Sequence, residues 1–251
     1  MTAPRTYQTE AIIIKHHKFG EADRVLTLYT PAQGKLRAIA KGTCRPGSKL
    51  GGHVELLTYS QLLLARGRNL DIITQAETLD SFMALKENLK LMSSGLYITE
   101  LIDAFTVEEV VDKDLFDLVI ATFQQLEQEK NIDSILRYFE LHILDRSGYK
   151  PQLQRCSACN SLLPAATNCF SPAQGGVLCV DCGFEEPISY PISLNALKVL
   201  RLWQNCDFTT ALKINIKDEL ALELEKILRD YIRHVLERQI KSTDFMDKLK
   251  Y

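Results

Sequence analysis

Four cysteines in two C-x2-C pairs constrain the fold of this chain more than any other feature. Cys156 and Cys159 form one pair, Cys179 and Cys182 form the other, and nineteen residues separate the pairs. This spacing is typical of a tetrahedral zinc site, because two short turns can bring four thiolates to one ion. Four sulfur ligands leave no open coordination position, so we expect one structural Zn²⁺ and no catalytic metal.

Reduced core cysteines or two disulfides are the alternatives for this set. No apolar run approaches the roughly 18 residues of a membrane helix, and an alternating stretch rather than a signal-peptide core follows the first five residues. We therefore expect a cytoplasmic protein without a membrane partner, where cysteines more often bind metal than form disulfides. The other three cysteines, Cys44, Cys169 and Cys206, are expected to be unligated.

Charge is unevenly distributed along the chain. The formal net charge is −2, but residues 1–80 contain eleven Lys and Arg against seven Asp and Glu, a net of +4, so the remainder carries −6. A basic first third on an acidic body indicates where a nucleic acid would bind.

Residues 1–80 are predicted to form a small β-barrel. Five short segments rich in Ile, Val, Leu, Thr and Tyr are separated by Gly and Pro, as in successive strands. They cover about 7–17, 22–30, 35–41, 54–65 and 69–77. Five strands in about 80 residues match an OB-fold barrel. An SH3-like barrel is the alternative that this pattern leaves open.

Basic residues gather on the third of these segments and on the loop after it. Side chains of a strand alternate between its two faces, so Lys35, Arg37 and Lys41 share the face opposite the apolar residues between them. If the five cations of this stretch engaged single-stranded DNA, log K would fall with log salt with a slope of about −3.5. A solvated outer strand face is the alternative. We predict DNA contact for this stretch and for the next hairpin turn, at Lys35, Arg37, Lys41, Arg45, Lys49, Arg66 and Arg68.

From Ser81 onward the apolar residues follow helical spacing. Helical segments are predicted at 82–105, from Asp114 to about 126, at about 132–144, at 194–203 and at about 218–240. The fold class is therefore α+β, with an OB-fold domain at 1–80 and a mainly helical domain at 81–251. The zinc module, at about 152–187, is inserted between helices and is expected to pack on them. The tail at 242–251 is expected to be loose.

An ordered series of short motifs resembles the bacterial RecO family of DNA-repair proteins over nearly the whole chain. These motifs are Glu10–Ile14, Gly20–Thr30, Gly34-Lys35, Ala40–Gly42, Arg45–Gly52, Phe139–Leu144, Gly148–Pro151, the four cysteines, Tyr231–Leu236 and Ile240–Ser242. Cys44 and Gly47 stand where two basic residues are common in the family.

The resemblance implies a fold and a function without catalysis. RecO proteins have an N-terminal OB-fold, a helical domain and often a zinc module, and their basic surface corresponds here to Lys35, Arg37, Lys41, Arg45 and Lys49. They bind single- and double-stranded DNA, anneal complementary strands and help load RecA onto SSB-coated single strands in recombinational repair. The implied partners are RecR, the SSB C-terminal tail and, in some bacteria, RecF, with action at the nucleoid.

Two other functions are weighed against this one. His53 and Glu55 match the H-x-E of zinc deaminases, but about a hundred residues separate them from Cys156 and the second cysteine pair would have no role. A zinc-ribbon regulatory factor that binds nucleic acid without annealing it shares the basic barrel and the zinc site. Sequence-specific binding to one duplex would favour that factor.

Overall fold

The computed structural model describes residues 5–128 and 131–249. By packing, the chain divides into two units, which are described separately below. Unit 1 comprises residues 1–128 and 241–251, and unit 2 comprises residues 129–240. The predicted boundary at residue 80 marks the change from strands to helices, whereas the first unit continues to residue 128.

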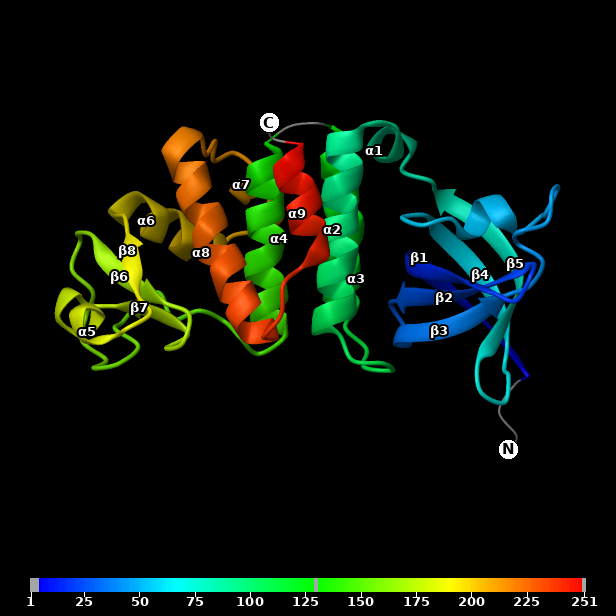
Figure 1. Cartoon of the computed structure of the whole chain (residues 1–251), viewed down its shortest axis with the longest axis horizontal. Coiled ribbons are helices and arrows are strands. Elements are labelled where there is room, and N and C mark those ends of the chain that lie inside the picture. Colours follow the sequence, from blue (N-terminus) through cyan, green and yellow to red (C-terminus); the bar gives the residue numbers. More distant parts are fainter. Residues whose placement is uncertain (1–4, 129–130, 250–251) are drawn as a thin grey trace. The chain divides into compact units, whose positions relative to one another are not determined.

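Unit 1 begins with a closed five-stranded barrel (Figure 1). Its strands follow the order β1-β2-β3-β5-β4, and β3 runs parallel to β5 while the other neighbours are antiparallel. This is an OB-like barrel, as the sequence predicts. The strands are β1 (Thr6–Phe19), β2 (Asp23–Thr30), β3 (Gly34–Ala40), β4 (Tyr59–Ala65) and β5 (Asp71–Asp80).

The predicted fourth strand, 54–65, begins five residues too early. Gly51–Val54 form the short 3-10 helix η1, and Leu57 has a positive φ of 62°, which a strand does not accommodate. The buried side chain of Val54 nevertheless contributes to the barrel interior. The apolar pattern therefore identifies the buried residues correctly and misplaces only the start of the strand.

Apolar side chains fill the barrel and also cover part of its outside. Alternate residues of β1 and β2, such as Ala11, Ile13, Leu26 and Leu28, face the interior core. The residues between them are buried as well: the ring of Tyr29 packs 6.1 Å, centroid to centroid, from that of Phe116 on the helix α3. Helices therefore cover the outer face of these strands, and only part of the barrel surface meets solvent.

The helices of unit 1 are α1 (Met83–Glu87), α2 (Leu89–Phe105), α3 (Lys113–Glu127) and α9 (Lys241–Lys248). The predicted helix 82–105 is interrupted at Asn88, because the Asn88 side chain accepts hydrogen bonds from the amides of Lys90 and Leu91 and caps α2. α3 is capped by Asp112 and not by Asp114.

The chain end forms helix α9, and the expectation of a loose tail from residue 242 is wrong for the residues that the structure describes. The Glu100 carboxylate of α2 accepts hydrogen bonds from the backbone amides of Lys241 and Ser242, both at 2.9 Å. The Ser242 hydroxyl also donates to it. These bonds satisfy amides that the first turn of a helix leaves unpaired. Residues 250 and 251 lie outside the described part.

Unit 2 is a helical body that carries the cysteine module (Figure 1). The guanidinium of Arg201 donates to the Leu153 carbonyl at 2.7 Å, and the Phe170 ring lies 5.7 Å from that of Tyr231. These contacts hold the module against α6 and α8. The elements are α4 (Ile132–Arg146), β6 (Asn168–Ser171), β7 (Gly176–Leu178), α5 (Val180–Glu185), β8 (Tyr190–Ile192), α6 (Leu194–Trp203), α7 (Phe208–Ala211) and α8 (Asp218–Leu236).

The predicted helix 218–240 ends four residues earlier than expected. Glu237 follows Leu236 with a φ of 51°, in the left-handed region that terminates helices. The apolar stripe continues to Ile240, which is buried, so the periodicity alone gave no sign of the break.

We predict that Glu100→Ala loosens α9 while the barrel stays folded. The loss of a capping carboxylate typically costs about 1 kcal/mol, which corresponds to roughly fivefold faster local opening. Hydrogen exchange of the amides of Lys241–Lys248 measures this directly. Glu87→Ala, at an exposed glutamate of α1, is the matched control and should leave their exchange unchanged.

Candidate metal centre and nucleic-acid interface

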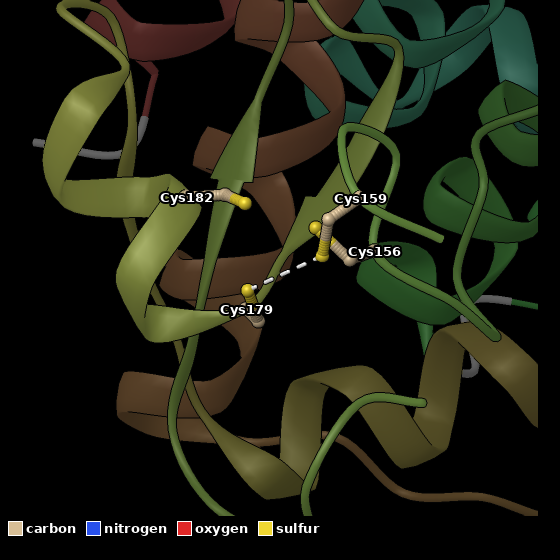
Figure 2. Close-up of side chains that lie close together, drawn as sticks. All are labelled: Cys156, Cys159, Cys179 and Cys182. Carbon is tan, nitrogen blue, oxygen red and sulfur yellow. Dashed lines mark hydrogen bonds between the residues drawn. The ribbon is translucent and has the colours of Figure 1, made fainter. Parts of the chain in front are cut away.

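The side chains of Cys156, Cys159, Cys179 and Cys182 point toward one another in unit 2 (Figure 2). All four sulfur atoms lie within 4.8 Å of one another, and those of Cys159 and Cys179 are 3.8 Å apart. A tetrahedral ion with Zn–S bonds of about 2.3 Å separates its sulfurs by about 3.8 Å. The cluster is therefore compatible with a zinc ion, and it does not include Cys44, Cys169 or Cys206.

Each cysteine pair is placed by its own backbone turn. Asn160 donates its amide to the Cys156 carbonyl at 2.9 Å and has a φ of 59°, which turns the first pair back on itself. The second pair lies at the start of α5, where the amide of Gly183 donates to the Cys179 carbonyl at 2.9 Å. Both pairs thus lie on short hydrogen-bonded turns, as the two-residue spacing predicts.

Glycine is required at position 183 because a side chain would not fit there, and not because of its backbone angles. A Cβ atom at this position would lie 2.5 Å from the sulfur of Cys169, which is closer than such atoms approach. Cys169 therefore supports the second turn by packing, although it is not one of the clustered thiols.

The clustered thiols influence one another's protonation. The Ser161 hydroxyl and backbone amide lower the pKa of Cys159 to about 6. The sulfurs of Cys179 and Cys159 raise the pKa of Cys182 to about 12. Four thiols this close cannot all ionise unless a cation compensates their charge. A divalent ion bound to the four sulfurs supplies that compensation.

Lys35, the first predicted DNA contact, is buried in unit 1. Its ammonium donates to the backbone carbonyl of Asp103 at 2.7 Å and lies 3.4 Å from the Asp103 carboxylate. The Lys35 side chain is 10% exposed, so it is not part of an accessible strip. The alternation places Lys35 outside the barrel as expected, but α2 covers that part of the outer face.

Arg37 remains accessible and has an acidic partner. Its Nε lies 3.0 Å from a carboxylate oxygen of Glu108, and both side chains are about half exposed. Glu108 belongs to the connection between α2 and α3. The predicted stretch therefore contains one cation that is paired and buried and another that is paired at the surface.

A cleft of about 530 Å³ opens beside this part of β3. β3, the turn between β4 and β5, and the α2–α3 connection form its walls, and its lining includes Tyr7, Arg37 and Arg66. The Arg66 guanidinium lies over the Tyr7 ring, 4.9 Å from its centroid. Aromatic and arginine planes beside exposed cations are the arrangement that OB-folds use for single strands.

The other predicted contacts are exposed but do not line this cleft. Lys41, Arg45 and Lys49 follow β3 in an exposed loop, and Arg68 lies at the tip of the β4–β5 turn. The structure thus brings Arg37 and Arg66 together at the cleft and leaves these four outside its lining. Whether any of them contacts DNA stays a prediction.

Two kinds of residue at the cleft are missing from the sequence prediction. Tyr7 was assigned only to a strand, yet its hydroxyl donates to Asp71 at 2.6 Å and its ring supports Arg66. Glu108 and Glu109 also line the cleft. They follow β3 by about seventy residues, so no local pattern indicates that they lie beside it.

An OB-like barrel followed by a helical unit with four clustered cysteines defines a class of OB-fold proteins with a metal-binding module. The family model described as Recombination protein O N terminal matches residues 1–82, and Recombination protein O C terminal matches residues 86–244. The chain therefore belongs to the RecO family of DNA repair proteins.

Several curated relatives named DNA repair protein RecO are similar along their length. One from Roseiflexus sp. (strain RS-1) is 42% identical over 98% of this chain and 87% of its own length. One from Dehalococcoides mccartyi is 40% identical over 99% and 98%, and one from Desulforamulus reducens is 35% identical over 98% and 95%.

In the described ranges 5–128 and 131–249, no helix is suited to span a membrane. None of the helices there combines the length and the apolar character that crossing a bilayer requires.

We predict that Cys156→Ser removes most bound zinc and destabilises unit 2 by at least several kcal/mol. Structural zinc is worth roughly 10–16 kcal/mol in small fingers, and three thiolates hold it less well than four. Zinc content and thermal unfolding measure the two effects. Cys206→Ser, which changes a thiol of the same unit outside the cluster, should keep one zinc per chain; equal zinc loss in both variants would contradict the assignment.

Proposed function

We propose that this protein is a DNA-binding recombination mediator without catalytic activity. It binds single- and double-stranded DNA through the barrel and anneals complementary strands. It also helps load RecA onto SSB-coated single strands. The observation that carries the proposal is a set of exposed cations on an OB-like barrel, with Arg37 and Arg66 at its cleft and Lys41, Arg45, Lys49 and Arg68 on its loops and turns.

The chemistry of this surface favours binding without sequence readout. Its charged groups are arginines and lysines on strands and turns, which suit phosphates and stacked bases. No helix of the barrel is available to enter a major groove, because β1–β5 and η1 form it. Such binding is what an annealing protein needs, since it must accept any pair of complementary strands.

The cysteine module has a structural role in this proposal. Four sulfurs would complete the coordination of one Zn²⁺ and leave no position for water, so the ion would stabilise unit 2. The partners proposed from family membership are RecR, the SSB C-terminal tail, RecA indirectly and, in some bacteria, RecF. Their action places the protein in the cytoplasm, at the nucleoid.

Annealing of two complementary oligonucleotides, each coated beforehand with cognate SSB, tests the proposal. Faster annealing without ATP supports it. No acceleration, combined with tight binding to one particular duplex, would instead support a zinc-ribbon regulatory factor.

We predict that Lys41→Glu combined with Arg45→Glu lowers affinity for single-stranded DNA by roughly tenfold. Each exposed contact contributes up to about 1 kcal/mol. Losing two phosphate contacts makes the slope of log K against log salt less steep by about 1.4. Fluorescence anisotropy across a salt series gives both quantities.

The control for these substitutions is Lys198→Glu combined with Lys213→Glu, which reverses two exposed charges of unit 2. An equal loss of affinity in this control would assign the effect to net charge and not to the loop. Charge reversal at Lys35 is unsuitable for this purpose, because it would bury two acidic groups side by side.

A further inference from the structure

The connection between α2 and α3, Thr106–Asp112, is held along β3 by its backbone. The amide of Glu109 donates to the Lys35 carbonyl at 2.9 Å, and Glu108 and Lys35 form a parallel bridge. A Cβ atom on Gly34 would lie 2.0 Å from the carbonyl oxygen of Val110, so the two backbones are in direct contact. None of these contacts uses the side chain of Glu108.

This backbone arrangement places the Glu108 carboxylate at Arg37. One carboxylate oxygen lies 3.0 Å from Arg37 Nε, so the two half-exposed side chains form an ion pair. A phosphate oxygen would bind the same guanidinium edge, because carboxylates and phosphates present similar acceptors to arginine. In the free protein the Nε of Arg37 is therefore already paired with a carboxylate.

The position of this pair matters because it lies on the lining of the cleft. Arg37 and Arg66 are the accessible cations of this lining, and Glu108 and Glu109 belong to it as well, on the connection that runs along β3. A nucleic-acid backbone that binds at Arg37 also meets the negative charge of Glu108, because the two side chains are paired and about equally exposed. The carboxylate must move away, or the phosphate must bind beside it against electrostatic repulsion.

We propose that Glu108 is a built-in competitor for phosphate, and that DNA binds at Arg37 only when this carboxylate is displaced. The inference rests on the proposed function, because it concerns the same cleft and the same ligand. Glu108 thereby sets the affinity of the barrel for DNA below the value that its cations alone would give.

Glu108→Gln tests the proposal, because it removes the charge and leaves the backbone contacts in place. The variant should bind an unstructured oligothymidine about two- to fivefold more tightly than the wild type, the range expected for release of a surface ion pair. Its slope of log K against log salt should be steeper by about 0.7, because one more phosphate is contacted. The full-length zinc-loaded protein is used, with fluorescence anisotropy as the readout.

Two further variants separate pairing from net charge. In an Arg37→Gln background, Glu108→Gln should no longer increase affinity to the same extent, because the competed group is absent. Glu109→Gln removes the same charge from the neighbouring residue on the same wall and should have a smaller effect. Equal gains from Glu108→Gln and Glu109→Gln, or an undiminished gain without Arg37, would overturn the proposal.

Failure of the inference and failure of the proposed function give different results. If the wild type binds with a salt-dependent affinity and Glu108→Gln binds equally or less tightly, Glu108 is not a competitor and merely orients Arg37. If neither protein binds DNA at any salt concentration, the proposed function fails and the inference fails with it.

Discussion

The buried ammonium of Lys35 fixes the arrangement on which the rest of unit 1 depends. It reaches the backbone carbonyl of Asp103 near the C-terminal end of α2, where helix carbonyls lack partners and a cation is favoured. Burial alone would raise the pKa of Asp103, but the hydrogen bond from Lys15 and the charge of Lys35 outweigh it, so the pKa lies below its ordinary value. The ammonium of Lys35 on β3 and the carboxylate of Asp103 on α2 thus join the two elements, and each compensates the charge of the other. The connection that follows α2 consequently lies along β3, and it forms one wall of the cleft.

Unit 2 uses buried charge in a related way. Arg137 of α4 bonds Glu140 on its own helix and lies 3.7 Å from Glu225 of α8, which also forms an ion pair with Arg229 at 2.8 Å. Removing one member of such a group would leave an uncompensated charge in the interior. The network therefore fixes how α4 and α8 pair. The cysteine module, whose Phe170 packs on Tyr231 of α8, is carried by this helix pair.

Local patterns predicted much of this fold, and the failures at the cleft and at α9 share one cause. The cysteine spacing identified all four clustered thiols, and the alternation along β3 placed Arg37 outside the barrel correctly. Local spacing carries no information about what covers a surface, so the burial of Lys35 and the proximity of Glu108 were not predictable. The same holds for α9, whose first amides are satisfied by Glu100 about 140 residues earlier in the chain.

The assignment of α9 to unit 1 has a consequence for the order in which the protein is completed during synthesis. Residues 129–240 pack as a separate unit, yet α2 packs against a helix that begins at Lys241. The ribosome must therefore release the whole of unit 2 before the partner of α2 emerges. Domains generally fold as they are made, from the N-terminus onward. The helical part of unit 1 instead remains incomplete until residues 241–248 have emerged, and a chain that stops before Lys241 lacks the helix that packs on α2.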